Sequence, residues 1–547
     1  MPTYQRPSSV LLRGGSIYAP HPSHATAMFT VRGSIAWIGD DAAAERYVED
    51  ADVVVDLQGR LVTSGFVDAH AHLASTGFAL QSVDLSTATS LEHMLDLLSG
   101  YADRLEAQVL VAQGWDETNW PEKRTPTAAE IDRAVGAKPA YIARVDSHSA
   151  VISSALLRRI PRLTELEGWR GDGRVERDAH HGARKAADDL RTESDRRQAL
   201  RLALEHAASL GVTSIHELNA PHIAPFDDFA LIKELRVLYR LPEVVGYWGE
   251  FLGGAGGVGG SGGVDVDEQL AGYAGDLCMD GAIGSRTAAL AERYADADST
   301  GHLYLDAASV RQHVVWCTQQ HLQAGFHVIG DRAMHTVVAG FQAAAEVVGV
   351  DALVAARHRL EHVEMPDDDG ISCMARLGIV ASVQPAFDAA WGAPGQLYDQ
   401  RLGWTRAEPM NPFATMQSAG VALAFGSDSP ITPIDPWAAV RAAAYHHRDS
   451  ERLTVSSAFD AHTRGGHRAR RYDEGGVLAP GAHATYAIWD VDAELGVQTP
   501  GHRGAGWSTN ARAGVAVLPD LHPDVALPTC METVVGGVRL YAAESAT

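Results

Sequence analysis

The sequence predicts an α/β protein: a distorted (β/α)8 TIM barrel with a small β-sandwich built from both termini. Helical stretches alternate with short apolar strands from about residue 90 to 450, which favours a parallel sheet. Turn-bounded strands occupy both chain ends. A doubly wound open sheet is the structural alternative, and the lack of a GxGxxG motif after an early strand weakens it. We expect residues 1–62 and 476–547 to form the sandwich and 63–475 the barrel.

Composition narrows the class of protein and its partners. The chain has 547 residues, too many for one hydrophobic core, with 46% hydrophobic and 21% charged residues. Its net charge of −24 opposes phosphate backbones and anionic membranes, so we expect neither a nucleic-acid nor a membrane partner. The four scattered cysteines are typical of reduced thiols. With no signal-peptide pattern and no apolar segment of membrane-spanning length, a cytoplasmic location is expected.

The two chain ends consist of short strands separated by Gly, Pro and polar residues. The last strand of the first group leads directly into an apolar strand at 61–73, where the barrel begins. We expect strands at 10–12, 17–18, 27–31, 35–39 and 53–56, and again at 484–490 and 533–541.

The middle of the chain supplies the barrel elements. Helices are expected at 91–104, 197–210, 309–324, 335–348 and 436–446, and strands at 109–112, 140–143, 212–215, 327–329, 379–383 and 422–425. Two segments interrupt this pattern. Residues 158–190 are rich in Arg, Asp and Gly without a clear period, and residues 253–263 form a Gly-rich loop, which we interpret as a surface insertion rather than a functional lid.

The strand at 61–73 ends in His-x-His, which makes it the centre of the functional interpretation. Residues two apart on a strand share a face, so His70 and His72 can bind one divalent metal ion. In a chain with 25 histidines such a pair is weak evidence by itself. Other ligands must come from elsewhere.

Three further candidates lie where apolar runs end: His327, His362 and Asp428. Barrel strands bring such residues together at the C-terminal rim. Taken singly, each histidine could be a hydrogen-bonded core residue and Asp428 a turn former. Taken together, three or four imidazoles and one carboxylate suit Zn²⁺ and leave room for a water, which the metal would activate for attack on a carbonyl. Asp428 can take the proton and pass it to the leaving group.

A series of motifs in chain order carries a resemblance over nearly the whole chain. The segments 65–72, 114–116, 144–149, 280–288, 327–333, 359–362 and 425–428 resemble the amidohydrolase superfamily, in particular its branch of N-substituted formamide deformylases and related metal-dependent hydrolases. The resemblance implies a barrel with a terminal sandwich and hydrolysis of amide or related C–N bonds. It places the ligand pattern on His70, His72, His327, His362 and Asp428, with Asp428 as general base and acid.

One departure from the family bears on the number of metal ions. Many members carry a lysine on the fourth strand that becomes carboxylated and bridges two metals, and Asp276 stands at that position here. Aspartate cannot form the carbamate, although it can ligate directly. We therefore predict one Zn²⁺ ion rather than a bridged pair, a plan in which His362 could instead donate a hydrogen bond to the substrate as a catalytic group. Cys278 is a fallback ligand, with a small buried residue as the favoured interpretation.

Substrate-binding candidates come from the family-like segments and the loops. We expect His148 to contact the substrate, with an inter-strand hydrogen bond as the alternative. The pair His216–Glu217, at another strand end, could face the site or serve packing. The remaining substrate candidates are Trp115, Arg144, Arg286 and Asp331, the last two also as residues that orient ligands. Aromatic residues in the loops suggest an apolar part of the pocket, with a place in the core or an interface as an equal alternative: Phe387, Trp391, Tyr398 and Trp404.

The sequence thus predicts a metal-dependent hydrolase that cleaves an amide-type C–N bond in a small molecule. A deaminase or an ester or lactone hydrolase on the same site is the alternative, because the fold alone does not decide the chemistry. A non-catalytic, ligand-binding barrel is a third hypothesis, disfavoured by the complete ligand set. A homodimer is one assembly that the sequence leaves open.

Overall fold

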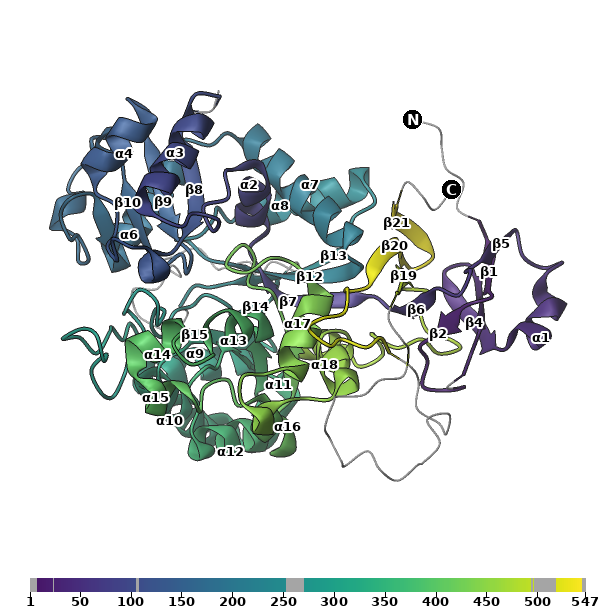
Figure 1. Cartoon of the computed structure of the whole chain (residues 1–547). Coiled ribbons are helices and arrows are strands. Elements are labelled where there is room, and N and C mark those ends of the chain that lie inside the picture. The colour runs from purple at the N-terminus through teal and green to yellow at the C-terminus, as the bar shows by residue number, and fades with distance from the viewer. Residues whose placement is uncertain are drawn as a thin grey trace.

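The computed structural model describes residues 7–22, 24–104, 108–251, 270–492, 495 and 518–543. A parallel barrel carries a β-rich module of both chain ends on one side and an inserted α/β layer above it (Figure 1). The predicted fold class is confirmed. The Gly-rich segment 253–263 lies outside the described residues.

The barrel is an eight-stranded sheet in the order β18-β17-β16-β15-β14-β13-β12-β7, with every neighbouring pair parallel. The strands from β7 to β18 are almost entirely buried, as the continuous apolar runs of a parallel sheet require. Their bounds are β7 Phe66–Ala71, β12 Val212–Asn219, β13 Glu243–Trp248, β14 Leu270–Tyr273, β15 Gln323–Val328, β16 Arg359–His362, β17 Val380–Val383 and β18 Leu423–Phe425.

The first and last strands close the ring at their C-terminal ends. The backbone N–H of Asp428 donates to the carbonyl of His70 at 2.7 Å, and that of His72 donates to Ser429 at 2.9 Å. Gly426 permits this approach, since a Cβ there would lie 2.5 Å from the His70 nitrogen. Closure therefore brings residues more than 350 positions apart to one edge.

Helices surround the barrel. The expected helices at 197–210, 309–324, 335–348 and 436–446 are confirmed as α7 Glu193–Ser209, α9 Ala307–Gln319, α10 Asp331–Val348 and α17 Pro436–Ala444. Others are α2 Leu73–Gln81, α8 Asp228–Leu238, α11 Val350–Ala356, α12 Asp368–Leu377, α13 Pro385–Trp391, α14 Leu397–Leu402, α15 Trp404–Ala407, α16 Phe413–Ser418, α18 Val455–Ala461 and α19 Arg464–Ala469. Among the described residues no single helix is long and apolar enough to cross a membrane, while the bent pair α10–α11 meets that test jointly.

An inserted layer between β7 and β12 corrects our assignment of barrel strands. Strands β8 Leu110–Trp115 and β9 Ala140–Arg144 pair with each other and belong to a separate sheet, β11-β10-β9-β8, so the segments 109–112 and 140–143 are not barrel strands. The sequence pattern of alternating strands and helices is the same for both sheets. It depends on local packing and does not reveal which strands pair with each other. The other elements are β10 Ser149–Ile152, β11 Arg174–Glu176, α3 Leu91–Ala102, α4 Ala128–Val135, α5 Ser154–Leu157 and α6 Arg177–Asp188.

Helix α6 corrects the interpretation of 158–190 as a segment without a period. Ala179, Ala183 and Ala187 repeat every four residues and are buried in the core of the insert. Alanine is only weakly hydrophobic, and charged residues surround these three alanines in the sequence. The helical period was therefore not recognised from the sequence. The opposite face of α6 remains available to line a cavity.

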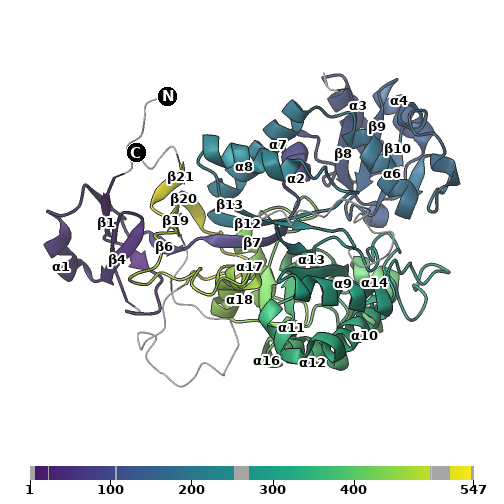
Figure 2. The ribbon, with the colours of Figure 1, turned by 180° about the vertical axis from the view of Figure 1, so that it is seen from behind.

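The small β module joins both ends of the chain, as expected. One sheet, β4-β3-β1-β5, is N-terminal, whereas the other, β2-β6-β19-β20-β21, places the C-terminal β19 antiparallel to β6 (Figure 2). A shared core that includes Leu12, Val62 and Tyr486 joins the two ends. The exact boundaries after 62 and 475 stay predictions. The strands are β1 Ser9–Arg13, β2 Ser16–Ile17, β3 Ala27–Val31, β4 Ser34–Gly39, β5 Val53–Asp56, β6 Leu61–Ser64, β19 Tyr486–Asp490, β20 Thr529–Val535 and β21 Val538–Ala542.

Candidate metal centre and active-site cavity

The six predicted ligand side chains all lie, buried, at the C-terminal rim of the barrel. They come from five strand ends: His70 from β7 and His72 directly after it, Asp276 after β14, His327 from β15, His362 from β16 and Asp428 after β18. In a parallel barrel the strand ends converge on one face, which explains how residues so distant in sequence meet.

Their inner atoms are close enough to share a cation. His72 Nε2 lies 3.0 Å from Asp428 Oδ1 and 3.2 Å from Asp276 Oδ2. His70 Nε2 lies 3.4 Å from Asp428 Oδ1 and 3.7 Å from Asp276 Oδ1. The inner atom of His362 lies within 4.8 Å of those of His70 and Asp276, and His327 Nδ1 lies 3.8 Å from Asp276 Oδ1. The structure thus brings the whole predicted set together.

Outer partners orient the imidazole of His70. Its Nδ1 lies 2.9 Å from Oε2 of Glu361. Although burial alone would raise it, the pKa of Glu361 is lowered to about 2 by the Arg359 guanidinium and by His70. Glu361 is therefore a carboxylate that accepts the Nδ1 proton, which leaves Nε2 of His70 as the nitrogen that faces the centre and would bind a cation.

The same arrangement holds for two other histidines. Nδ1 of His362 donates to the amide oxygen of Gln384 at 2.8 Å, and Nε2 of His327 donates to the carbonyl of Gly281 at 3.3 Å. In each ring the second nitrogen then faces the centre, where it could bind a cation. An outer hydrogen bond that sets the tautomer in this way is typical of metal-binding histidines.

A divalent cation fits this set of atoms. His70 Nε2 and Asp276 Oδ1 are buried without a hydrogen-bond partner, and a cation between them would satisfy both. Burial would raise the pKa values of Asp276 and Asp428, but the positively charged imidazoles lower both, and the two carboxylates in turn raise the pKa values of His70, His72 and His327. The carboxylates thus attract positive charge, which a divalent cation would supply in place of the protons, and imidazole with carboxylate suits Zn²⁺.

Two of the ligand residues have unusual backbone conformations. His362 has φ 71° and Asp428 has φ 52°, both in the left-handed region that non-glycine residues seldom adopt. Strain of this kind persists where the surrounding structure imposes it, and it is concentrated at functional sites. Here it turns the two side chains toward the centre where their strands end.

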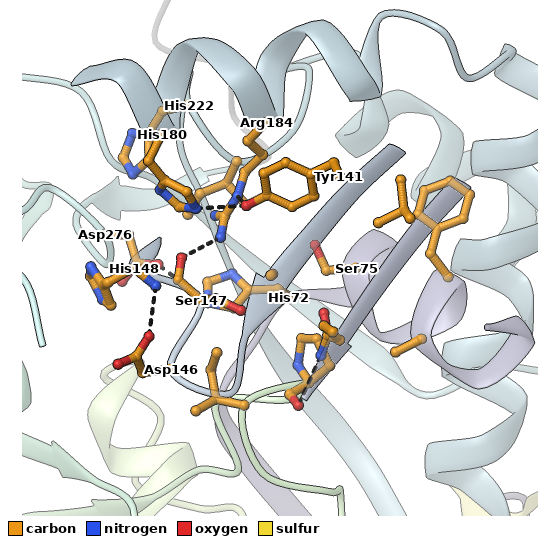
Figure 3. Close-up of a pocket in the computed structure, with 18 of the residues that line it drawn as sticks. His72, Ser75, Tyr141, Asp146, Ser147, His148, His180, Arg184, His222 and Asp276 are labelled. Atoms are coloured by element: carbon orange, nitrogen blue, oxygen red, sulfur yellow. Dashed lines mark hydrogen bonds and ion pairs between the residues drawn. The ribbon is translucent and has the colours of Figure 1, made fainter. Parts of the chain in front are cut away.

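A cavity opens from the metal centre toward the inserted layer (Figure 3). Its empty space, including open solvent at the mouth, is about 970 Å³. His148 lines it, and the His148 and His327 rings are 5.1 Å apart. Its position is compatible with the expected substrate contact.

A second cavity of about 350 Å³ branches from the same centre. It shares His148, His327, His362 and Asp428 with the first cavity, and Phe387, Trp391 and Tyr398 supply its apolar wall. These three aromatic residues occupy the apolar position that the sequence suggested. Trp404 does not line either cavity and packs beside His447.

The structure does not bring the other four substrate candidates to these cavities. Trp115 is in the core of the insert, 1% exposed, and its Nε1–H donates to the carbonyl of Ile142 at 3.1 Å. Arg286 pairs with Asp296 at 2.6 Å. These two side chains line neither cavity.

Arg144 and Asp331 likewise have structural partners. Arg144 forms ion pairs of 2.6 to 2.9 Å with three carboxylates of the insert, and Asp331 accepts the backbone N–H of Ala291 at 2.8 Å. The presence of Arg144 and Asp331 in family-like motifs is compatible with a role in the fold of the loops. The motifs alone do not distinguish such a structural role from substrate binding.

The structure also shows the surroundings of His216, Glu217 and Cys278, whose roles the sequence left open. His216 accepts a hydrogen bond from Arg359 at 3.0 Å and Glu217 accepts the N–H of Leu73 at 2.7 Å, so both serve packing. Cys278 lines the cavity, but burial raises the pKa of its thiol well above the ordinary value, which disfavours a thiolate ligand.

Sequence reasoning missed the far wall of the first cavity. That wall consists of residues of the insert and of the loop after β12. They are Tyr141, His180, His181, Arg184 and His222. Most of them do not end a barrel strand, so the strand-end rule could not find them. The signal available was the His180–His181 pair followed four residues later by Arg184 on one helix.

The closed parallel barrel and its rim of imidazoles and carboxylates define a metal-dependent hydrolase. Residues 53–541 match the sequence model of the Amidohydrolase family, and the chain belongs to this family. The predicted resemblance is confirmed.

Relatives extend over most of the chain. Protein LONG AFTER FAR-RED 3 of Arabidopsis thaliana is 25% identical over 89% of this chain and 88% of its own length. N-substituted formamide deformylase of Arthrobacter pascens is 23% identical over 86% and 91%. The crystal structure of an uncharacterized metal-dependent hydrolase from Pyrococcus horikoshii OT3 is similar with a TM-score of 0.69 at 26% identity, covering 89% of this chain and 98% of that one.

Proposed function

We propose that this hydrolase cleaves an amide-type C–N bond, as in an N-substituted formamide or a related amide, of a small organic substrate. The observation that carries the proposal is the ring of inward-facing imidazole nitrogens of His70, His327 and His362 beside Asp276 and Asp428. The similarity to N-substituted formamide deformylase supports the choice of bond.

The residues at the centre would hold one Zn²⁺ ion, with Asp276 as a direct ligand in place of a carboxylated lysine. When bound there, the ion supplies Lewis-acid polarisation of the carbonyl and lowers the pKa of water towards neutrality. Asp428 lines both cavities and can accept the proton of the attacking water on a carboxylate oxygen. It then delivers that proton to the leaving nitrogen, which departs as a neutral amine.

The substitution Asp428→Asn tests this assignment. Asparagine tolerates the left-handed backbone at φ 52°, so the fold should persist. We expect turnover to fall by about 10²- to 10⁴-fold, the range for loss of a general acid–base. Asp228→Asn is a matched control, because Asp228 is a buried aspartate paired with Arg196 on the outer helices.

The substrate panel comprises N-substituted formamides, other acyl amines, esters, lactones and aminated heterocycles. Activity confined to aminated heterocycles, or to esters and lactones, would replace the amide proposal by a deaminase or an ester hydrolase. Full activity of Asp428→Asn, with the same metal content as the wild type, would end the proposed role of Asp428.

A further inference from the structure

Arg184 on α6 places a positive charge in the wall of the first cavity without a carboxylate partner. Its Nη2 donates to the carbonyl of Ser147 at 2.7 Å and its Nε to the hydroxyl of Tyr141 at 3.3 Å. Within the part of the chain that the structure describes, no Asp or Glu oxygen lies within 4.0 Å of its guanidinium, and Nη1 has no hydrogen-bond partner. Figure 3 shows the side chain directed towards Ser147 and the cavity.

Two other enclosed arginines pair with carboxylates. Arg191, which lines the same cavity, pairs with Asp188 at 2.7 Å. Arg359 is fully buried and pairs with Glu361. Arg184 lines the cavity without such an ion pair, and an enclosed cation is stabilised by a counter-ion, so its position suits an anionic partner from outside the chain.

The side chains around Arg184 fix its orientation without neutralising it. Since Nε of Arg184 donates to Tyr141, the Tyr141 hydroxyl donates in turn to Nε2 of His180 at 2.6 Å. Burial and the charge of Arg184 lower the pKa values of His180 and His181, the latter to about 4, and burial chiefly lowers that of His222. The wall therefore places the charge of Arg184 among neutral imidazoles. Asp188, one helical turn further along α6, also lines the cavity and attracts this charge from beyond 4.0 Å, but its ion pair is with Arg191.

Arg184 and the metal centre lie along one cavity. The Ser147 carbonyl that binds Arg184 precedes His148 in the chain, and His148 lies beside His327 with ring centroids 5.1 Å apart. Ser147 has φ 51°, a left-handed conformation imposed at this turn. A molecule whose reacting bond lies at the metal centre can therefore extend past His148 to Arg184.

We propose that Arg184 binds a carboxylate of the substrate, so that the compound hydrolysed is an amide that also bears one negative charge. A guanidinium without an ion pair matches a carboxylate, which accepts two parallel hydrogen bonds in its plane. The apolar part of such a substrate fits the wall of Phe387, Trp391 and Tyr398. This inference rests on the proposed amide hydrolysis for the nature of the substrate, but the anion site itself does not.

Binding tests the anion site independently of turnover. The probes are 3-phenylpropionate and its uncharged counterpart 3-phenylpropanamide, titrated into the zinc-loaded protein by calorimetry. We expect the wild type to bind the carboxylate at least about tenfold more tightly than the carboxamide, and Arg184→Gln to remove that preference. Arg184→Lys should keep part of it, and Arg286→Gln, outside both cavities, all of it.

A carboxylate can also bind a metal ion directly, and the metal-depleted wild type controls for this without any substitution. If the metal-depleted protein still binds the carboxylate more tightly than the carboxamide, the result supports Arg184 as the anion site. If the preference for the carboxylate disappears, the probe binds at the metal centre and the proposal is overturned. An unchanged preference in a folded Arg184→Gln protein overturns it as well.

Kinetics then separate this inference from the proposed function. The substrates are N-formylphenylalanine and N-formyl-2-phenylethylamine, which differ by the carboxylate. Faster turnover of the first, lost in Arg184→Gln, supports both proposals. Equal turnover of the two leaves amide hydrolysis in place and refutes the carboxylate site, whereas turnover of neither contradicts amide hydrolysis while the binding result still decides the role of Arg184.

Discussion

Replacing Glu361 by glutamine tests how the barrel prepares its metal ligands. Glu361 is fully buried between Arg359, whose Nη2 lies 2.9 Å from Oε2, and His70, whose Nδ1 lies 2.9 Å from the same oxygen. Glutamine has nearly the same shape and removes only the negative charge. Its amide can donate as well as accept, so the inward lone pair of His70 is no longer imposed.

Two magnitudes follow from these contacts. Loss of an outer partner of a metal-binding histidine costs about 10- to 100-fold in metal affinity, or about 1.4–2.7 kcal/mol. Arg359 also loses its counter-ion while buried, and breaking such a pair lowers the free energy of unfolding by about 3–5 kcal/mol. The variant should therefore bind Zn²⁺ more weakly and unfold more easily.

Competition with a fluorescent zinc chelator measures the first effect, and urea unfolding of the metal-free protein measures the second. Asp228→Asn is the control, because it removes another buried carboxylate that pairs with an arginine, Arg196, and Asp228 lines neither cavity. It should lower stability and leave zinc affinity unchanged. If Glu361→Gln binds zinc within threefold of the wild type, the reasoning that Glu361 prepares His70 for the metal is refuted.

Two other predictions concern the cavity and the inserted layer. His148→Ala should lower kcat/KM about 10-fold or more at unchanged metal content, whereas Arg286→Ala, outside both cavities, should change it less than threefold; equal losses would contradict the placement of His148 at the substrate. Arg124 lowers the pKa of Glu130 to about 2 from its ordinary value of 4.5, so the stability that Glu130 contributes is present above pH 4.5 and is lost as the pH falls towards 2. The difference in unfolding free energy between wild type and Glu130→Gln should therefore shrink between pH 5 and pH 3, and a difference that grows on acidification would refute this assignment.

Much of the fold could be predicted because its signals are local. The apolar run at 61–73 and the alternation after residue 197 correspond to β6, β7 and the elements of the barrel. The inserted layer could not be recognised, since β8 and β9 are as apolar and as short as barrel strands. Which sheet a strand joins depends on its neighbour, and a single sequence does not record neighbours.

The metal centre could be predicted for a related reason. Each of its ligands ends or closely follows a barrel strand, as His327 does in β15, and barrel geometry brings all strand ends to one rim. Arg184 and His180 reach the cavity from a helix of the insert, for which no such rule exists. A position in a recognised motif likewise did not reveal a residue's role. Arg144, for example, pairs with carboxylates of the inserted layer and does not line the cavity.

The amino-acid sequence by itself determined the class of this protein, the rim on which its chemistry lies and the six side chains that meet there, because strand periodicity and parallel-barrel geometry are local rules that repeat. Only the tertiary structure decided which way each imidazole presents its lone pair, and that an inserted layer supplies the opposite wall with an arginine that has no carboxylate partner. Tautomers and cavity walls depend on contacts between distant segments, such as His70 with Glu361 and Ser147 with Arg184, and those contacts exist only once the chain has folded.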